Sequence, residues 1–144
     1  MLTDDYSRKS WVILLGLKSE TEKRLKQWVV QTEREVGHAL GRFRTDNGGE
    51  FIKNSLKEWL ATRGTTEEFT PPRSPQSNGV AERMNRTLQE KARSMMAQSG
   101  LRGGSRGEVF KAASYLRNRG PVSNQPKTPQ ELWTGRMPSI AHFR

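Results

Sequence analysis

The chain of 144 residues contains no cysteine, which excludes a disulfide framework and any zinc site built on thiolates. It has only two histidines, at positions 38 and 142, so no histidine cluster offers a metal site either. No apolar run approaches the length of a membrane span, and the N-terminus has no secretory hydrophobic segment. We therefore expect a soluble, intracellular protein with no membrane partner and no evident targeting signal.

Acidic residues are few, and apolar residues are fewer than in most globular domains. There are 15 Asp and Glu against 25 Lys and Arg, which gives a formal net charge of +10 and a pI near 10.5. The apolar fraction of 32% predicts a thin core for a chain of one domain's length. Because Lys and Arg neutralise phosphates and release their counterions, the charge predicts a polyanionic partner such as nucleic acid.

Hydrophobic periodicity predicts strands and helices in alternation, followed by helices alone, which indicates an α/β domain. Strands are predicted at the apolar run Trp11–Leu15 and over residues 40–45 and 65–69. Three short strands make a poor sheet. Helices are predicted over 20–36 with a capping box from Ser19 to Glu22, from 54 or 55 to Gly64, over 80–98 and 108–118, and from Pro129 to a stop at Gly135. Residues 70–79 are rich in Pro, Ser and Gly and predict a loop.

Two carboxylates are the candidate catalytic and metal-binding residues. Asp46 ends a predicted strand, at the rim where α/β sheets place ligand sites, and Glu82 opens a predicted long helix, with 35 residues between the two acids. Each alone also fits an ordinary turn or a solvated helix face with a Glu82–Arg86 ion pair. Together they predict shared hard divalent cations such as Mg²⁺ and phosphodiester chemistry. A third acid is needed, and Asp4, Asp5 and Glu50 are weak candidates.

The predicted long helix has two distinct faces on a helical wheel. Its apolar face carries Val80, Met84, Leu88, Ala92 and Met95. The other face places basic and amide groups in line with Glu82, namely Arg86, Gln89 and Arg93. An acid followed by such groups suits a metal ligand beside a DNA track.

Several motifs in order resemble the integrase catalytic core of copia-type LTR retrotransposons. They are Asp-Asp-Tyr-Ser-Arg (4–8), Thr-Asp-Asn-Gly-Gly-Glu-Phe (45–51), Pro-Gln-Ser-Asn-Gly-Val-Ala-Glu-Arg-Met-Asn-Arg-Thr-Leu (75–88), Ala-Arg-Ser-Met (92–95) and residues 127–140. The resemblance covers nearly the whole chain. It implies a ribonuclease H-like fold, a mixed sheet flanked by helices, and an Asp, Asp, Glu triad with Mg²⁺ or Mn²⁺ that joins element 3′ ends to target DNA.

The resemblance also assigns roles to individual residues. It makes Asp46 the second acid and Glu82 the third, and it makes 70–79 the active-site loop. The family's first acid lies on a strand before the motif at residues 4–8, so we expect this chain to lack that acid, the first strand and most of the second. The predicted nucleic-acid-binding residues are Arg44, Arg73, Asn78, Arg83, Arg86, Gln89 and Arg93.

The expected organisation is a partial catalytic core over residues 1–119 and a downstream extension with a short helix over 120–144. We expect the isolated chain to be marginally stable and to lack strand-transfer activity. The family implies DNA partners, a homo-oligomer in the full-length form and a nuclear location. Two alternatives remain open at this point: a non-catalytic nucleic-acid-binding remnant, and a ribonuclease H-like nuclease.

Overall fold

The computed structural model describes residues 1–45, 54–69, 75–100, 103–123 and 125–142, and the chain forms two compact units. Unit 1 combines Met1–Leu14 with Val80–Arg144, and unit 2 is the continuous segment Leu15–Gly79. Unit 1 therefore brings together the two ends of the sequence. The predicted division between residues 119 and 120 stays a prediction.

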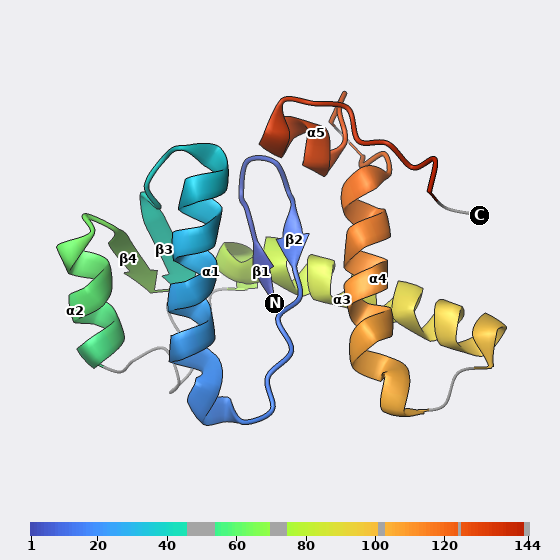
Figure 1. Ribbon diagram of the computed structural model, residues 1–144, viewed down its shortest axis with the longest axis horizontal. Coiled ribbons are helices and arrows are strands. Elements are labelled where there is room, and N and C mark those ends of the chain that lie inside the picture. Colours follow the sequence, from blue (N-terminus) through green and yellow to red (C-terminus); the bar gives the residue numbers. More distant parts are fainter. Residues whose placement is uncertain (46–53, 70–74, 101–102, 124, 143–144) are drawn as a thin grey trace. The chain divides into compact units, whose positions relative to one another are not determined.

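Unit 2 is built around a pair of parallel strands. After a short 3-10 helix, η1 (Lys18–Glu20), it contains α1 (Thr21–Val36), β3 (Arg42–Thr45), α2 (Asn54–Thr62) and β4 (Thr66–Phe69). Strands β3 and β4 lie side by side, with Arg42 opposite Thr66 and Thr45 opposite Phe69 (Figure 1). Parallel neighbours need a crossover connection, and α2 lies in it. These two strands and two helices confirm the sequence predictions.

The buried residues of unit 2 come from one face of each element. Leu25 and Val29 of α1, Phe43 of β3, and Leu56 and Leu60 of α2 are all buried. Helix α1 ends as predicted, because Gly37 adopts the left-handed conformation (φ 74°) and donates its N–H to the Glu33 carbonyl at 2.8 Å.

The predicted capping box at the start of α1 is wrong. Glu20, not Ser19, occupies the N-cap position and makes no side-chain capping bond. The Glu22 carboxylate instead accepts from Lys26 Nζ at 2.7 Å and from Ser55 Oγ at 2.9 Å. These contacts tie α1 to the start of α2, and this tertiary use of Glu22 outweighs its local capping role.

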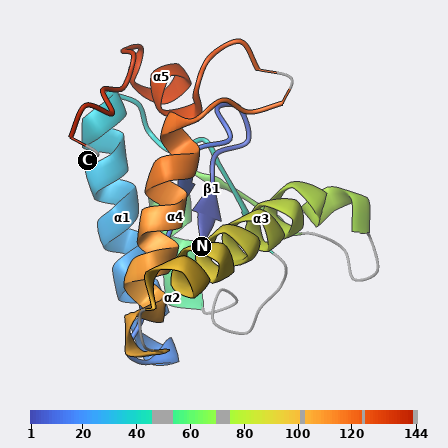
Figure 2. The same ribbon diagram turned by 90° about the vertical axis from the view of Figure 1, so that its right-hand side faces the viewer.

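Unit 1 joins a small hairpin to a layer of helices. Strands β1 (Leu2–Thr3) and β2 (Ser10–Trp11) pair antiparallel. Helix α3 (Pro75–Ser99) contributes its residues from Val80 onward, followed by η2 (Gly103–Ser105), α4 (Arg106–Arg119) and α5 (Pro129–Thr134). Helices α3 and α4 cross steeply (Figure 2). Their contact holds the core cluster of Met84, Leu88, Ala92, Val109 and Ala113.

Two predicted boundaries differ from the structure. The strand predicted over Trp11–Leu15 ends at Trp11, and Leu14 and Leu15 are about 40% exposed, because β2 has a pairing partner only along Leu2–Thr3. Helix α3 begins at Pro75, five residues before the predicted start, so the loop prediction is wrong over 75–79, and 70–74 lie outside the described residues. Proline is tolerated there because the first N–H groups of a helix have no intrahelical acceptor.

An amide side chain covers the free edge of β2. The Asp4 N–H donates to the Lys9 carbonyl at 2.9 Å, so the polar backbone groups of Ser10 point to the opposite edge. There Asn118 Oδ1 accepts from Ser10 N at 3.0 Å, and Asn118 Nδ2 donates to Ser10 O at 2.7 Å. Ser114 Oγ donates to the same carbonyl at 2.9 Å.

This contact sets which side of α4 faces inward. Val109, Ala113, Ser114 and Asn118 are buried, whereas Leu116 is 40% exposed. Helix α5 begins and ends as predicted: Thr128 Oγ1 accepts from Glu131 N at 3.2 Å, and Gly135 is left-handed. Among the helices that the structure describes, none combines the length and apolarity needed to cross a membrane.

Candidate active site and nucleic-acid interface

The two predicted faces of α3 are confirmed by its burial pattern. Met84, Leu88 and Ala92 are buried against α4, and Met95 is half-buried beside them. Four side chains at i, i+4, i+7 and i+11 are exposed on another face, and we call them the Glu82 stripe: Glu82, Arg86, Gln89 and Arg93. The helix backbone thus holds one carboxylate, one amide and two guanidinium groups in line.

The Glu82 carboxylate has no hydrogen bond or ion pair with any residue that the structure describes. The expected alternative, a Glu82–Arg86 ion pair along the helix, is not among the ion pairs of the described residues. An exposed carboxylate without a partner can bind a cation without breaking an existing contact. Its oxygen atoms are the donors that hard divalent cations prefer.

Other predicted site residues fall where the structure gives no side-chain description. Asp46, Glu50 and Arg73 lie outside the described residues. Asn78 belongs to the first turns of α3, and its side chain is likewise outside the description. Within the described ranges, no group of three or more His, Asp or Glu side chains is placed to hold a metal ion. The pairing of Asp46 with Glu82 therefore stays a prediction.

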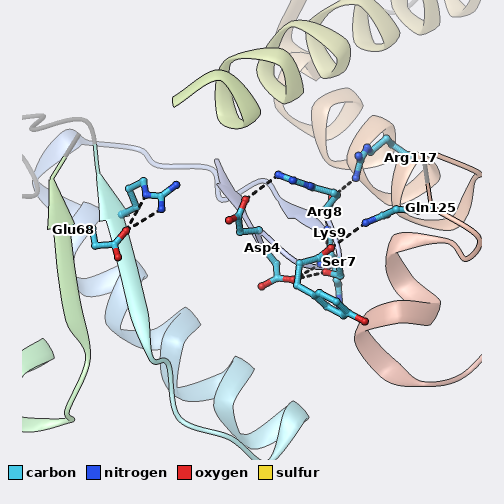
Figure 3. Close-up of polar contacts among 10 residues, drawn as sticks. Asp4, Ser7, Arg8, Lys9, Glu68, Arg117 and Gln125 are labelled. Atoms are coloured by element: carbon cyan, nitrogen blue, oxygen red, sulfur yellow. Dashed lines mark hydrogen bonds and ion pairs between the residues drawn. The ribbon is translucent and has the colours of Figure 1, made fainter. Parts of the chain in front are cut away.

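Asp4 and Asp5 have structural roles in the hairpin turn of unit 1. The Asp4 carboxylate accepts from Ser7 N at 2.7 Å and from Ser7 Oγ at 2.6 Å, which closes the turn, as Figure 3 shows. Asp5 pairs with Arg8 at 2.9 Å on the surface. Both carboxylates are thus engaged locally, which agrees with their low rank as candidates for a third acid.

Arg44 differs from the arginines of α3 because its charge is already paired. Its Nε and Nη2 atoms both donate to Glu68 Oε2, at 3.1 and 2.9 Å, across the β3–β4 pair. Arg42 also reaches Glu68, at 3.4 Å. A phosphate would have to compete with Glu68 for Arg44, whereas Arg83, Arg86 and Arg93 are exposed without a described carboxylate partner.

A basic groove in unit 1 was missed by the sequence reasoning. It has a volume of about 790 Å³ and is lined by Arg8, Arg83, Lys91 and Arg117, among other residues. Arg83 and Lys91 stand eight residues apart, a helical repeat that the wheel could have revealed. No sequence signal links Arg8 with Arg117, because they are 109 residues apart.

Comparisons with known proteins point to one group of mobile elements. The chain matches no protein-family model. It is 41% identical over 142 residues to a retrovirus-related Pol polyprotein from transposon TNT 1-94 of Nicotiana tabacum, covering 98% of this chain and 11% of the relative. It is 27% identical over 145 residues to that from transposon RE1 of Arabidopsis thaliana, covering 100% and 10%. The chain thus spans about a tenth of the length of these curated relatives.

Solved structures support the same relationship at the level of fold. A chain of the simian T-cell lymphotropic virus intasome, in complex with PP2A regulatory subunit B56 gamma, matches with a TM-score of 0.73 and 18% identity, over 99% of this chain and 50% of that one. The HTLV-2 integrase catalytic core domain in complex with magnesium matches at 0.66 and 18%, over 91% and 80%. The predicted ribonuclease H-like fold is confirmed. The chain belongs to the family of retrovirus-related Pol polyproteins of plant copia-like transposons, and it has the fold of integrase catalytic cores.

Proposed function

We propose that the chain is the catalytic-core part of a retrotransposon integrase, a divalent-metal-dependent polynucleotidyl transferase that joins element 3′ ends to target DNA. The observation that carries this proposal is the Glu82 stripe, in which an exposed carboxylate without a described partner lies in line with Arg86, Gln89 and Arg93. The 41% identity to a transposon Pol polyprotein supports it.

Asp46 and Glu82 are the residues proposed to hold Mg²⁺ or Mn²⁺. Both supply carboxylate oxygens, which suit these cations. An integrase core of the same fold was solved with magnesium, which supports the choice of ion. When bound, such ions activate the attacking oxygen and stabilise the leaving oxygen at phosphorus. The chain's own contribution is to hold Glu82 on a rigid helix whose opposite face is buried.

The basic residues of α3 are proposed to position DNA through its phosphates. Glu82 and Arg93 are eleven residues apart, about 16 Å along the helix axis, which matches between four and five 3.4 Å steps of one DNA strand. Phosphate contacts fix the position of the duplex and carry no sequence information. The proposed contact residues are Arg44, Arg73, Asn78, Arg83, Arg86, Gln89 and Arg93, with Arg44 the weakest because Glu68 pairs with it.

The proposal extends to the assembly and its location. The HTLV-2 core of the same fold was solved in dimeric and trimeric forms, and the simian T-cell lymphotropic virus protein within an intasome. We infer that the full-length form of this protein also acts as a homo-oligomer on element ends and target DNA. Target DNA places that activity in the nucleus.

Metal binding by the chain itself is the first test. We expect Glu82→Gln and Asp46→Asn each to weaken Mn²⁺ binding by at least about tenfold in an electron paramagnetic resonance titration. Glu90→Gln is the matched control, since Glu90 is exposed on the same helix outside the Glu82 stripe. Equal Mn²⁺ affinity in wild type and both site variants would contradict the assignment.

Catalysis is tested in an extended form of the chain, to which the upstream strand that carries the family's first Asp is added. Mn²⁺-dependent strand transfer should appear in that version and disappear in Glu82→Gln and Asp46→Asn. Activity that survives either substitution would show that the acids are assigned wrongly. Cleavage of an RNA–DNA hybrid without strand transfer would favour the nuclease alternative.

A further inference from the structure

The basic groove of unit 1 lies between segments that are distant in sequence. Arg8 comes from the hairpin turn, Arg83 and Lys91 come from α3, and Arg117 comes from the end of α4. After α4, the wall is completed by Gly120, Pro121, Val122, Ser123 and Gln125. The apolar part of the lining includes Val80, Met84 and Leu116.

The charge of this groove is of one sign. Four of its lining residues are cationic, and the described lining residues include no Asp or Glu. Arg83 and Lys91 are exposed and have no described carboxylate partner. Arg8 is paired, but its partner Asp5 has a side chain that is 73% exposed and does not line the groove.

Arg117 is the most constrained of the four cations. It is half-buried, its Nη1 donates to the Arg8 carbonyl, and it has no carboxylate partner among the described residues (Figure 3). Burial, and then the charge of Arg8, lower the pKa of the Arg117 guanidinium. A bound anion would offset both effects. Beside it, Gln125 donates Nε2 to the Tyr6 carbonyl at 3.0 Å, which ties the segment after α4 to the hairpin turn.

The groove and the Glu82 stripe occupy different faces of α3. Arg83, Thr87 and Lys91 are rotated by about 100° to 180° from Glu82 around a helix of 3.6 residues per turn. Arg83 and Lys91 are also about 12 Å apart along the helix axis. That distance corresponds to between three and four steps of 3.4 Å along one DNA strand, which is longer than one small anion.

We propose that this groove is a second phosphate-binding site, separate from the Glu82 stripe, which holds the backbone of duplex DNA without reading its sequence. Three of its four cations are arginines, whose planar guanidinium groups suit bidentate contact with phosphate oxygens. The inference rests on the proposed function in two respects: DNA is the ligand, and Arg83 is already among the proposed contacts, whereas Arg8, Lys91 and Arg117 are not. It adds a contact surface that the acidic residues and their stripe do not supply.

The test measures binding of a short fluorescent duplex by anisotropy, in EDTA, between about 50 and 200 mM salt. The groove variant is Arg83→Gln with Lys91→Gln. Loss of two phosphate contacts should weaken binding about 60-fold at 0.1 M salt and reduce the slope of log K against log salt by about 1.8. The control, Arg106→Gln with Lys111→Gln, removes the same charge from exposed positions on α4 outside the groove.

Charge-conserving and fold controls accompany these variants. Arg83→Lys with Lys91→Arg should keep the wild-type salt slope, because the two charges remain in place. Far-ultraviolet circular dichroism should be unchanged in all three double variants, since all four substituted positions are exposed and none belongs to the buried cluster.

Each outcome supports or overturns the inference. It is overturned if the groove variant binds the duplex as tightly as wild type does, or if the control variant loses as much affinity as the groove variant. It is also overturned if the wild-type chain binds no duplex. If the groove variant binds labelled polyglutamate less tightly than wild type does, but binds the duplex equally well, the occupant is an acidic protein segment rather than DNA. Unchanged Mn²⁺ affinity in Glu82→Gln, with weakened duplex binding in the groove variant, would refute the proposed function and support the groove.

Discussion

Replacing Asn118 by alanine removes the side chain that covers the free edge of β2. Two hydrogen bonds to the Ser10 backbone are lost, together with a longer one from Ser10 Oγ at 3.4 Å. Ser114 Oγ remains in contact with both the carbonyl and the hydroxyl of Ser10, so only the Ser10 N–H is left without a partner. Ser10 is 1% exposed, so that N–H does not regain water. An unsatisfied buried donor costs about 1–3 kcal/mol, and the second lost bond adds about 1 kcal/mol. We expect unfolding free energy to fall by about 2–4 kcal/mol.

The matched control is Asn85→Ala, because Asn85 is exposed on α3 and has no described partner. Both substitutions exchange asparagine for alanine within a helix, so the gain in helix propensity of up to about 0.7 kcal/mol is common to both. The difference between the two changes in unfolding free energy therefore isolates the contact of Asn118 with Ser10. Asn118→Asp should cost more than Asn118→Ala, because a charged acceptor then faces the Ser10 carbonyl. That excess should shrink as the pH is lowered, since protonation restores a donor.

Urea unfolding followed by circular dichroism measures the change in free energy, and hydrogen exchange at the Ser10 amide reports on the edge itself. The Ser10 amide should exchange faster in Asn118→Ala and at the wild-type rate in Asn85→Ala. An Asn118→Ala variant within about 0.5 kcal/mol of Asn85→Ala, with Ser10 still protected, would refute the reasoning.

Three further expectations follow from burial, backbone conformation and the predicted triad. Leu88→Ala should lower the unfolding free energy by about 2–5 kcal/mol in urea, because Leu88 is fully buried, whereas its exposed neighbour Gln89→Ala should stay within about 0.5 kcal/mol. Gly37→Ala should cost about 1–2 kcal/mol through backbone strain alone, since φ is 74° and no atom lies within 4 Å of an added Cβ; an unchanged urea midpoint would contradict this. The isolated chain should give no strand-transfer product with Mn²⁺, and joined DNA on a gel would show that the expected missing acid is not required.

The sequence by itself determined the features that depend on near neighbours along the chain. The 3.6-residue period of α3 separated Met84, Leu88 and Ala92 from the exposed Glu82 stripe. Gly37 and Gly135 ended their helices where a left-handed residue is needed. The ordered motifs were sufficient to predict the family and fold that the comparisons confirm. Asp46 stays a prediction of the sequence alone.

Only the tertiary structure decided the features that depend on a distant partner. The apolar run after Trp11 has strong strand character, yet a strand exists only where another backbone pairs with it, and here that is Leu2–Thr3. Ser10 and Asn118 are 108 residues apart, and neither position marks the other in the sequence. The basic groove likewise needs Arg8 and Arg117 to meet across the fold, because charges concentrate into a site only when packing brings them together.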